Sequence, residues 1–163
     1  MNDFKKIWGH IGVGLFWILW PVWVVYFRIY NKRSRIVVVY QDQILLVQGW
    51  LGTRKYGLPG GGLRKNESYE AGVVRELFEE TSVVVPESAL VKIGTRRNKK
   101  YHFNYDATYF CVDLNEDPNM HFKLGEIFKA AWLPLDSLDM SLLDDEAIYA
   151  LKRYKPMRQS SLL

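Results

Sequence analysis

Cysteine and histidine are scarce in this chain of 163 residues, which contains one cysteine and three histidines. The single cysteine, Cys111, excludes an intramolecular disulfide framework and a zinc site built from cysteines. Charged residues make up 25% of the chain and hydrophobic residues 48%, so a disordered or fibrous protein is also excluded. A chain of this length has room for one catalytic domain and little more.

A strong charge of one sign is also lacking over most of the chain. The net charge is +4, but residues 1–35 carry six basic side chains and one acidic side chain. Residues 36–163 carry 16 basic and 17 acidic side chains. Because the basic character belongs to the N-terminal segment, the rest of the chain has no electrostatic footprint for a polyanion. We therefore expect no nucleic acid as a partner.

One long apolar run is present, close to the N-terminus. Residues 7–27 read IWGHIGVGLFWILWPVWVVYF and contain no Asp, Glu, Lys or Arg. A helix of these 21 residues would span about 31 Å, close to the thickness of a bilayer core. The leading interpretation of residues 1–31 is a hydrophobic helix that anchors the protein in a membrane. A segment in the membrane interface and a core element of a soluble domain remain alternatives, because Pro21 would kink a helix.

Basic residues flank this run unevenly. Two precede it and four follow it: Lys5 and Lys6, then Arg28, Lys32, Arg33 and Arg35. An excess of positive charge marks the cytoplasmic side of a membrane segment. The sequence therefore predicts a membrane-anchored protein whose C-terminal domain faces the cytoplasm.

The remaining sequence predicts strands and two helices, and hence an α+β fold. Residues 34–47 are typical of a hairpin around a polar turn, and residues 57–62, GLPGGG, of a tight glycine-rich loop. A helix is expected from Ser68 to about Thr81. Strands are expected over residues 90–95, 103–114 and 127–133.

Two further local features concern the later part of the chain. The basic sequence RRNKK, residues 96–100, is interpreted as the turn between two strands. Asp144 is expected to cap a last amphipathic helix. Residues 157–163 are expected to form a flexible tail.

A cluster of glutamates follows the glycine-rich loop. Glu76, Glu79 and Glu80 stand at positions i, i+3 and i+4, so their carboxylates share one face of the expected helix. Like charges at this spacing destabilise a helix, and a divalent cation would offset the repulsion. Mg²⁺ binds carboxylate oxygens and takes further ligands from substrate phosphates. The cluster therefore suggests Mg²⁺-assisted phosphate chemistry, with Glu67 approaching from the loop and Arg75 orienting a carboxylate.

The spacing of these residues resembles the Nudix box, the signature G-x5-E-x7-R-E-U-x-E-E-x-G-U in which U is aliphatic. The matching positions are Gly61, Glu67, Arg75-Glu76-Leu77 and Glu79-Glu80. Ser82 stands where the signature has glycine. That glycine ends the helix in a left-handed conformation, which costs serine about 1 kcal/mol. Beyond the box, the resemblance extends over residues 34–154.

This resemblance implies an α/β/α sandwich with a mixed β-sheet, occupying residues 32–156. It also implies hydrolysis of a nucleoside diphosphate derivative, NDP-X, to NMP and P-X, with Mg²⁺ required and Mn²⁺ as a substitute. By position, Glu76, Glu79 and Glu80 correspond to the metal-holding glutamates. Gly61 and Glu67 correspond to supporting positions, and Arg75 to the orienting arginine.

Weaker signals lie outside the box. Glu126 could be a later carboxylate that accepts a proton, although a surface glutamate at a strand start is the plainer interpretation. Arg96, Arg97 and Tyr101 could contact substrate, although a solvated turn explains the two arginines. Two alternatives to the nucleotide hydrolase remain open: a non-catalytic nucleotide-binding module at the membrane, and a hydrolase of a lipid-linked diphosphate. Nothing in the sequence indicates an oligomeric state.

Overall fold

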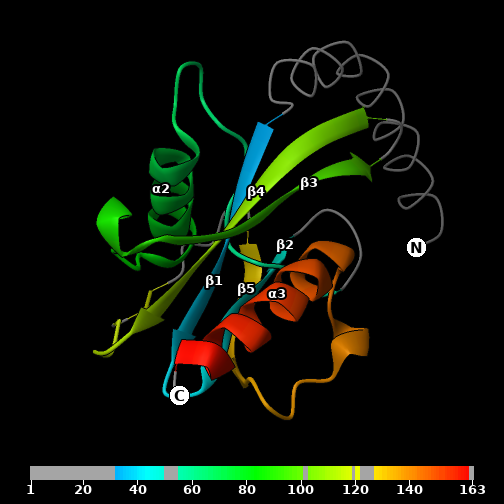
Figure 1. The fold of residues 1–163 in the computed structure, drawn as a ribbon. Helices are drawn as coiled ribbons and strands as arrows, with labels where there is room; N and C mark the ends of the chain where they lie inside the picture. Colours follow the sequence, from blue (N-terminus) through cyan, green and yellow to red (C-terminus); the bar gives the residue numbers. More distant parts are fainter. Residues whose placement is uncertain (1–31, 50–54, 101–102, 119, 122–126, 162–163) are drawn as a thin grey trace, which may run out of the picture.

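The computed structural model describes residues 32–49, 55–100, 103–118, 120–121 and 127–161. The strands are β1 (Lys32–Tyr40), β2 (Gln43–Gly49), β3 (Val91–Lys100), β4 (Phe103–Leu114) and β5 (Ile127–Pro134). The helices are α2 (Tyr69–Thr81) and α3 (Asp145–Ser161), with short 3-10 turns at Glu87–Ala89 and Met140–Leu142. Figure 1 shows their arrangement along the chain.

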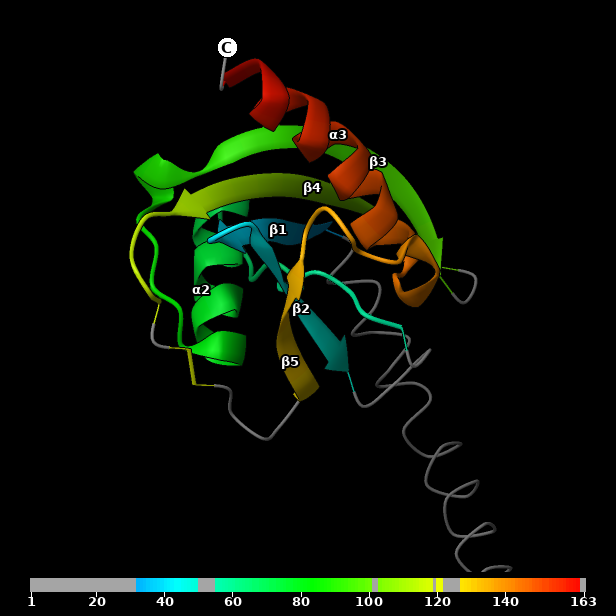
Figure 2. The same cartoon turned by 90° about the horizontal axis from the view of Figure 1, so that it is seen from below.

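The five strands form one mixed sheet in the order β3-β4-β1-β2-β5. β1 and β4 are parallel, whereas β1–β2, β2–β5 and β3–β4 are antiparallel. Helices α2 and α3 cover opposite faces of this sheet (Figure 2). The predicted α+β class and mixed sheet are therefore confirmed.

Alternation along β1 explains why both faces of the sheet are covered. Ile36 and Val38 pack in the cluster beneath α2, with Leu77 of that helix. Val37 and Val39 pack in the cluster beneath α3, with Leu151. A strand buried on both faces reads as a continuous apolar run, which is what IVVV in β1 shows.

The glycine-rich loop fills a gap within the sheet. β1 and β2 pair next to their turn, at Val39–Ile44 and Tyr40–Gln43. Farther along, β2 instead bonds the loop, where Gly57 and Val47 exchange backbone hydrogen bonds of 2.8 and 3.0 Å. On the other side, the backbone N–H groups of Ser34 and Ile36 in β1 donate to Gly61 and Pro59, each at 3.0 Å. The loop is thus held between two strands rather than outside them.

Helix α2 begins and ends as the sequence indicates. The Ser68 side chain accepts a hydrogen bond of 3.0 Å from the Ala71 N–H at the start of the helix. At its end Ser82 adopts a left-handed conformation, with φ of 61°, and its N–H donates to Phe78 at 2.9 Å. Serine therefore occupies the strained position that glycine fills in the signature.

Two local expectations differ from the structure. The RRNKK sequence lies within β3, which continues to Lys100, and is not a turn. β3 is an edge strand, where basic side chains are favoured because they discourage pairing with other chains, so charge did not mark a turn here. The expected tail, residues 157–163, is helical as far as Ser161, and Arg158 pairs with Asp42 at 2.5 Å. The cap on α3 is confirmed, because Asp144 accepts from the Ala147 N–H at 2.8 Å.

The apolar run at residues 7–27 lies outside the described residues. Within the described part of the chain, neither helix is both long and apolar enough to cross a membrane.

Replacing Ser82 with glycine should stabilise the domain. Glycine adopts a positive φ without steric cost, so about 1 kcal/mol of strain is removed, and the thermal midpoint should rise by about 2–4 °C. Differential scanning calorimetry measures this change. Ser82→Ala is the control, since alanine keeps the strain; an equal rise in that variant would contradict the explanation.

Candidate active site

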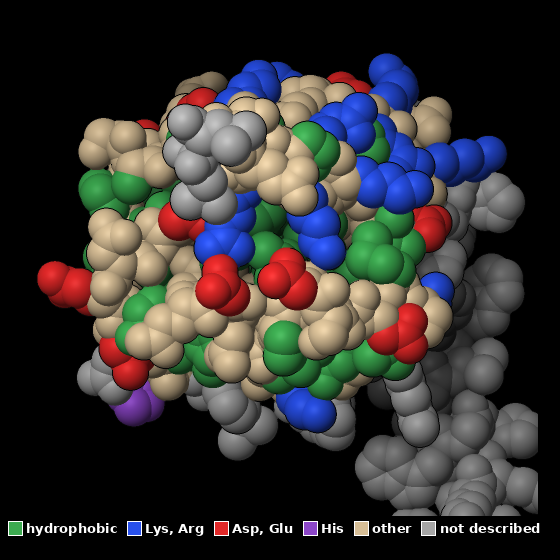
Figure 3. Space-filling model, turned by 60° about the horizontal axis from the view of Figure 1, so that its bottom comes forward, with side chains coloured by type: hydrophobic (Ala, Val, Ile, Leu, Met, Phe, Trp, Pro, Cys, Tyr) green, Lys and Arg blue, Asp and Glu red, His purple; other side chains and the backbone are tan. Residues whose placement is uncertain are grey.

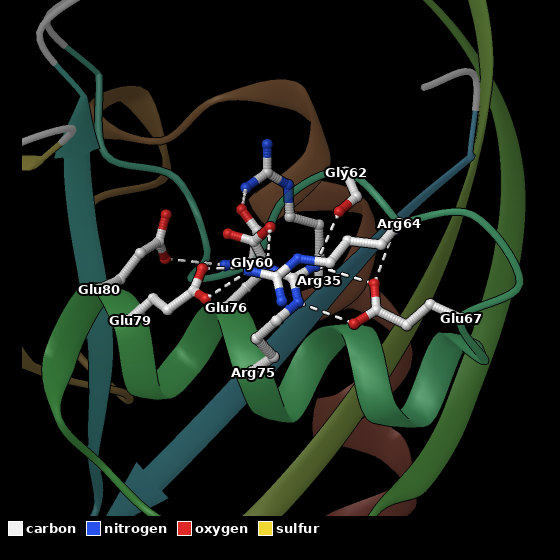
Figure 4. A network of polar contacts seen from close by, with 9 residues as sticks. All are labelled: Arg35, Gly60, Gly62, Arg64, Glu67, Arg75, Glu76, Glu79 and Glu80. Atoms are coloured by element: carbon white, nitrogen blue, oxygen red, sulfur yellow. Dashed lines mark hydrogen bonds and ion pairs between the residues drawn. The ribbon is translucent and has the colours of Figure 1, made fainter. Parts of the chain in front are cut away.

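Arg75 lies at the centre of a polar network on α2 (Figure 4). Its Nε and Nη2 donate to the two carboxylate oxygens of Glu67, at 2.7 and 2.9 Å. Its Nη1 donates to Glu76 at 2.8 Å and to Glu79 at 3.0 Å, and Nη2 also donates to the Gly62 carbonyl at 3.0 Å. One guanidinium therefore orients three box carboxylates, whereas the sequence indicated pairing with one.

The fork-shaped pair between Arg75 and Glu67 is the strongest contact in this network. The Arg75 hydrogen bonds lower the pKa of Glu67 from its ordinary value to about 2, against the opposing effect of partial burial. The backbone N–H of Arg64 donates to the same carboxylate at 2.7 Å and lowers its pKa further. The Glu67 hydrogen bonds in turn raise the pKa of Arg75. Glu67 therefore stays ionised and fixes Arg75 in place.

Glu79 is the outermost carboxylate of this group, with 46% of its side chain exposed. The Arg64 side chain donates to it at 2.9 Å, in addition to the contact from Arg75. Two guanidinium groups thus relieve the repulsion among the glutamates of this helix face. Arg64 occupies a variable position of the signature, so the spacing did not identify it.

The other two box glutamates face the glycine-rich loop. Glu80 accepts a hydrogen bond of 2.9 Å from the Gly60 N–H. A β-carbon on Gly61 would lie 2.5–2.7 Å from the Glu76 carboxyl group, closer than such atoms approach. A side chain at position 61 would therefore displace the Glu76 carboxylate from its place beside the loop.

The residues of this helix face fit a hard cation by their chemistry. Glu76, Glu79 and Glu80 supply only oxygen ligands, which Mg²⁺ prefers. No group of three His, Cys, Asp or Glu side chains lies close enough to hold a metal ion in the part of the chain that is described. The three carboxylates instead accept hydrogen bonds from Gly60, Arg64 and Arg75, so the three-glutamate metal site stays a prediction.

A second polar cluster lies on the α3 face of the sheet and was missed from the sequence. Arg35 of β1 donates from Nε to Glu146 of α3 at 3.1 Å. Its Nη1 donates to the carbonyls of Leu58, at 3.3 Å, and Gly60. In the sequence Arg35 reads as one of several basic residues ahead of the apolar run IVVV, and its partner lies 111 residues away in the chain.

The two weaker candidates on β3 occupy opposite faces of the sheet. Arg96 pairs in register with Ala107 on the α3 face, and its guanidinium lies 5.2 Å from the Tyr149 ring. Arg97 pairs with Asp106 instead, so the two arginines do not form one anion-binding cluster. Arg96, Tyr149 and Lys152 line a shallow groove of about 260 Å³. In the view of Figure 3, Lys and Arg side chains, drawn in blue, are densest at the upper right.

The remaining candidates, Tyr101 and Glu126, lie outside the described residues.

The Glu67–Arg75 pair predicts a pH-dependent contribution to stability. Glu67 has a folded-state pKa of about 2, against an ordinary value of 4.5. A lowered pKa stabilises the fold above the unfolded value, and this stabilisation is lost as pH falls from about 4.5 toward about 2. Glu67→Gln should therefore lower the urea midpoint at pH 7, and lower it much less at pH 3, in metal-free buffer.

The control for this prediction is the same substitution in an Arg75→Leu background. In the Arg75→Leu protein, the change in urea midpoint caused by Glu67→Gln should depend far less on pH. A wild-type difference that is equal at both pH values would show that the Arg75 pairing does not stabilise the ionised Glu67.

Comparison with known proteins gives a consistent result. A family model described as NUDIX domain matches residues 30–154. The mRNA-decapping protein g5R of African swine fever virus (isolate Pig/Kenya/KEN-50/1950) is 26% identical over 153 residues, covering 83% of this chain and 60% of that protein. The chain thus spans less than two thirds of the length of this relative. Diphosphoinositol polyphosphate phosphohydrolase 3-alpha of Mus musculus is 25% identical over 122 residues, covering 75% of this chain and 68% of that protein.

Solved structures share the fold. An Ap4A hydrolase of C. elegans, crystallised as a binary complex, superposes with a TM-score of 0.67 at 16% identity, covering 80% of this chain and 98% of that one. The predicted enzyme class, a pyrophosphohydrolase, is supported by the family match together with the curated relatives. The chain belongs to the Nudix family.

Proposed function

We propose that this protein hydrolyses a diphosphate linkage in a nucleoside diphosphate derivative, NDP-X, to give NMP and P-X, with Mg²⁺ as the cofactor. The observation that carries the proposal is the face of α2 on which Arg75 gathers Glu67, Glu76 and Glu79 beside the glycine-rich loop. Nudix hydrolases generally use a divalent cation, and the oxygen-only donor set of this face is suited to one.

Glu76, Glu79 and Glu80 would hold the cation. When bound, it supplies positive charge that neutralises the phosphoryl oxygens during attack by water. All three already accept hydrogen bonds, from Arg75, Arg64 and Gly60, so each would exchange a hydrogen bond for the cation. Glu79 is 46% exposed, which leaves its side chain free to turn.

Arg75 and Glu67 have a different role, which is to orient the others. Their paired hydrogen bonds of 2.7 and 2.9 Å fix the guanidinium so that Nη1 points at Glu76 and Glu79. Arg64 is 63% exposed beside Glu79. Once Glu79 turns away, the Arg64 guanidinium is available to a phosphate oxygen of the substrate.

A carboxylate must also accept the proton of the attacking water. Glu79 is more exposed than Glu67 and Glu76, whose side chains are 14% and 15% exposed. We assign the proton to an Oε atom of Glu79 for this reason.

Glu79→Gln should reduce turnover at least 100-fold, because the amide neither holds the cation nor accepts the proton. Its thermal midpoint should change little, since Glu79 is a surface residue. Product analysis with Mg²⁺ on a panel of nucleoside diphosphate compounds measures the effect. Glu70→Gln, on the same helix but outside the network, is the matched control and should keep full turnover.

Two outcomes would contradict the proposal. Retained turnover in Glu79→Gln would remove this residue from the reaction. If the wild-type protein cleaves no compound of the panel, in Mg²⁺ or in Mn²⁺, a lipid-linked diphosphate is favoured as the substrate instead. An assay with lipid diphosphates in micelles then tests that alternative.

We also propose that residues 7–27 anchor the protein in a membrane with residues 32–156 on the cytoplasmic side. The support is in the sequence: 21 residues without a formal charge, followed by four basic residues. The full chain should float with phospholipid vesicles in a density gradient and resist extraction with sodium carbonate. A chain of residues 32–163 should stay at the bottom; equal behaviour of the two chains would contradict the anchor.

A further inference from the structure

Gly60 connects the two faces of the sheet through its own peptide groups. Its N–H donates to Glu80 of α2 on one face, at 2.9 Å. Its carbonyl accepts from Arg35, whose side chain lies on the α3 face. With φ at +126°, and with a β-carbon placed only 2.2 Å from the Ser34 carbonyl oxygen, no other residue fits here. The glycine-rich loop is therefore seated tightly enough to transmit a shift from one face to the other.

Glu146 is the residue that holds Arg35. Its Oε2 accepts from Arg35 at 3.1 Å, and the two side chains are 12% and 17% exposed. Its Oε1 accepts from Tyr105 at 2.9 Å and from Asn98 at 3.1 Å. Residues of three strands thus bind this one carboxylate of α3. A salt bridge on a helix surface usually has a single partner.

The charge of Arg35 interacts with two acidic groups. Burial acts to lower the pKa of Arg35, but Glu146 and then Glu80 raise it above its ordinary value. Carboxylates of both helices, Glu146 of α3 and Glu80 of α2, therefore stabilise the charge of Arg35. Glu146 has the hydrogen bond, so it determines where the positive charge lies.

We propose that Glu146 is a positioning residue for the catalytic face: it holds Arg35 on the Leu58 and Gly60 carbonyls, and thereby fixes the Gly60 peptide whose N–H binds the Glu80 carboxylate. This inference rests on the proposed function for its purpose. The inference predicts that a change at Glu146 of α3 alters cation binding at the box glutamates, and this effect can be measured without any substrate.

The test is Mn²⁺ binding to the full chain in detergent, measured by the electron paramagnetic resonance signal of free Mn²⁺. Glu146→Gln keeps an oxygen that accepts from Tyr105 and Asn98 but removes the charge that holds Arg35. Loss of a residue that orients a metal ligand typically weakens metal binding about 10-fold, and we expect that loss here. The apparent Mg²⁺ constant of turnover should rise in parallel, with kcat at saturating Mg²⁺ changed far less.

Tyr154→Phe is the matched control. Tyr154 lies on the same helix, is buried, and donates a hydrogen bond to Asp113 of β4, so its loss also loosens α3 on the sheet. It should leave the Mn²⁺ affinity within about twofold of wild type, because its hydrogen bond is to Asp113 and not to Arg35 or the loop. Hydrogen exchange at residues 57–62 should accelerate in Glu146→Gln and not in Tyr154→Phe.

Arg35→Lys gives a second route should Glu146→Gln not fold. Lysine keeps the positive charge but cannot bond Glu146 and the Gly60 carbonyl through separate nitrogens, so Mn²⁺ affinity should again fall. Unchanged affinity in both variants, equal weakening in Tyr154→Phe, or no Mn²⁺ binding by wild type would overturn the proposal. The wild-type protein could bind Mn²⁺, with weaker binding in the Glu146 and Arg35 variants only, and yet cleave no diphosphate. That result would contradict the proposed function and leave the role of Glu146 supported.

Discussion

The seating of the glycine-rich loop between β1 and β2 is the constraint on which the rest of the site depends. The loop is bonded to both strands, so its position is as well defined as that of a strand. Gly60 lies against the Ser34 carbonyl with no space for a side chain, and a side chain at Gly61 would displace the Glu76 carboxyl group. Because the loop cannot move independently of the sheet, the carboxylates that face it are placed by the sheet as well. The box helix contributes the residues, and the loop determines where they point.

Charge balance explains how four glutamates can share so small a region. Arg75 binds three of them, and Arg64 supports the most exposed one. The arrangement has a functional advantage beyond stability: the partners of Glu79 are guanidinium groups, which also bind phosphate. Exchange of a carboxylate for a phosphate on Arg64 would keep the charges paired throughout. A site organised in this way keeps its charges paired when it is empty and, by exchange of partners, when substrate is bound.

Local patterns allowed much of this structure to be predicted, whereas contacts between distant segments did not. The hairpin, the box helix over about residues 68–81 and the Asp144 cap of α3 all follow from neighbouring residues. RRNKK was misassigned because whether a basic stretch forms a turn or an edge strand depends on β4, which follows it. The pairing of Arg35 with Glu146 could not be predicted, since Arg35 reads only as a basic residue after the N-terminal run until the fold brings the two together. In the box itself, spacing identified the carboxylates, but their hydrogen-bond partners could be identified only in the folded structure.

The way the chain enters the domain has a consequence for its environment. The carbonyl of Lys32, the first described residue, accepts a hydrogen bond of 3.0 Å from Leu63, just past the glycine-rich loop. The far end of β1 is roughly 26 Å away, at about 3.3 Å per residue, and there Arg158 of α3 meets Asp42. Anything joined ahead of residue 32 therefore leaves the domain beside the box, while an addition after α3 leaves from the opposite end.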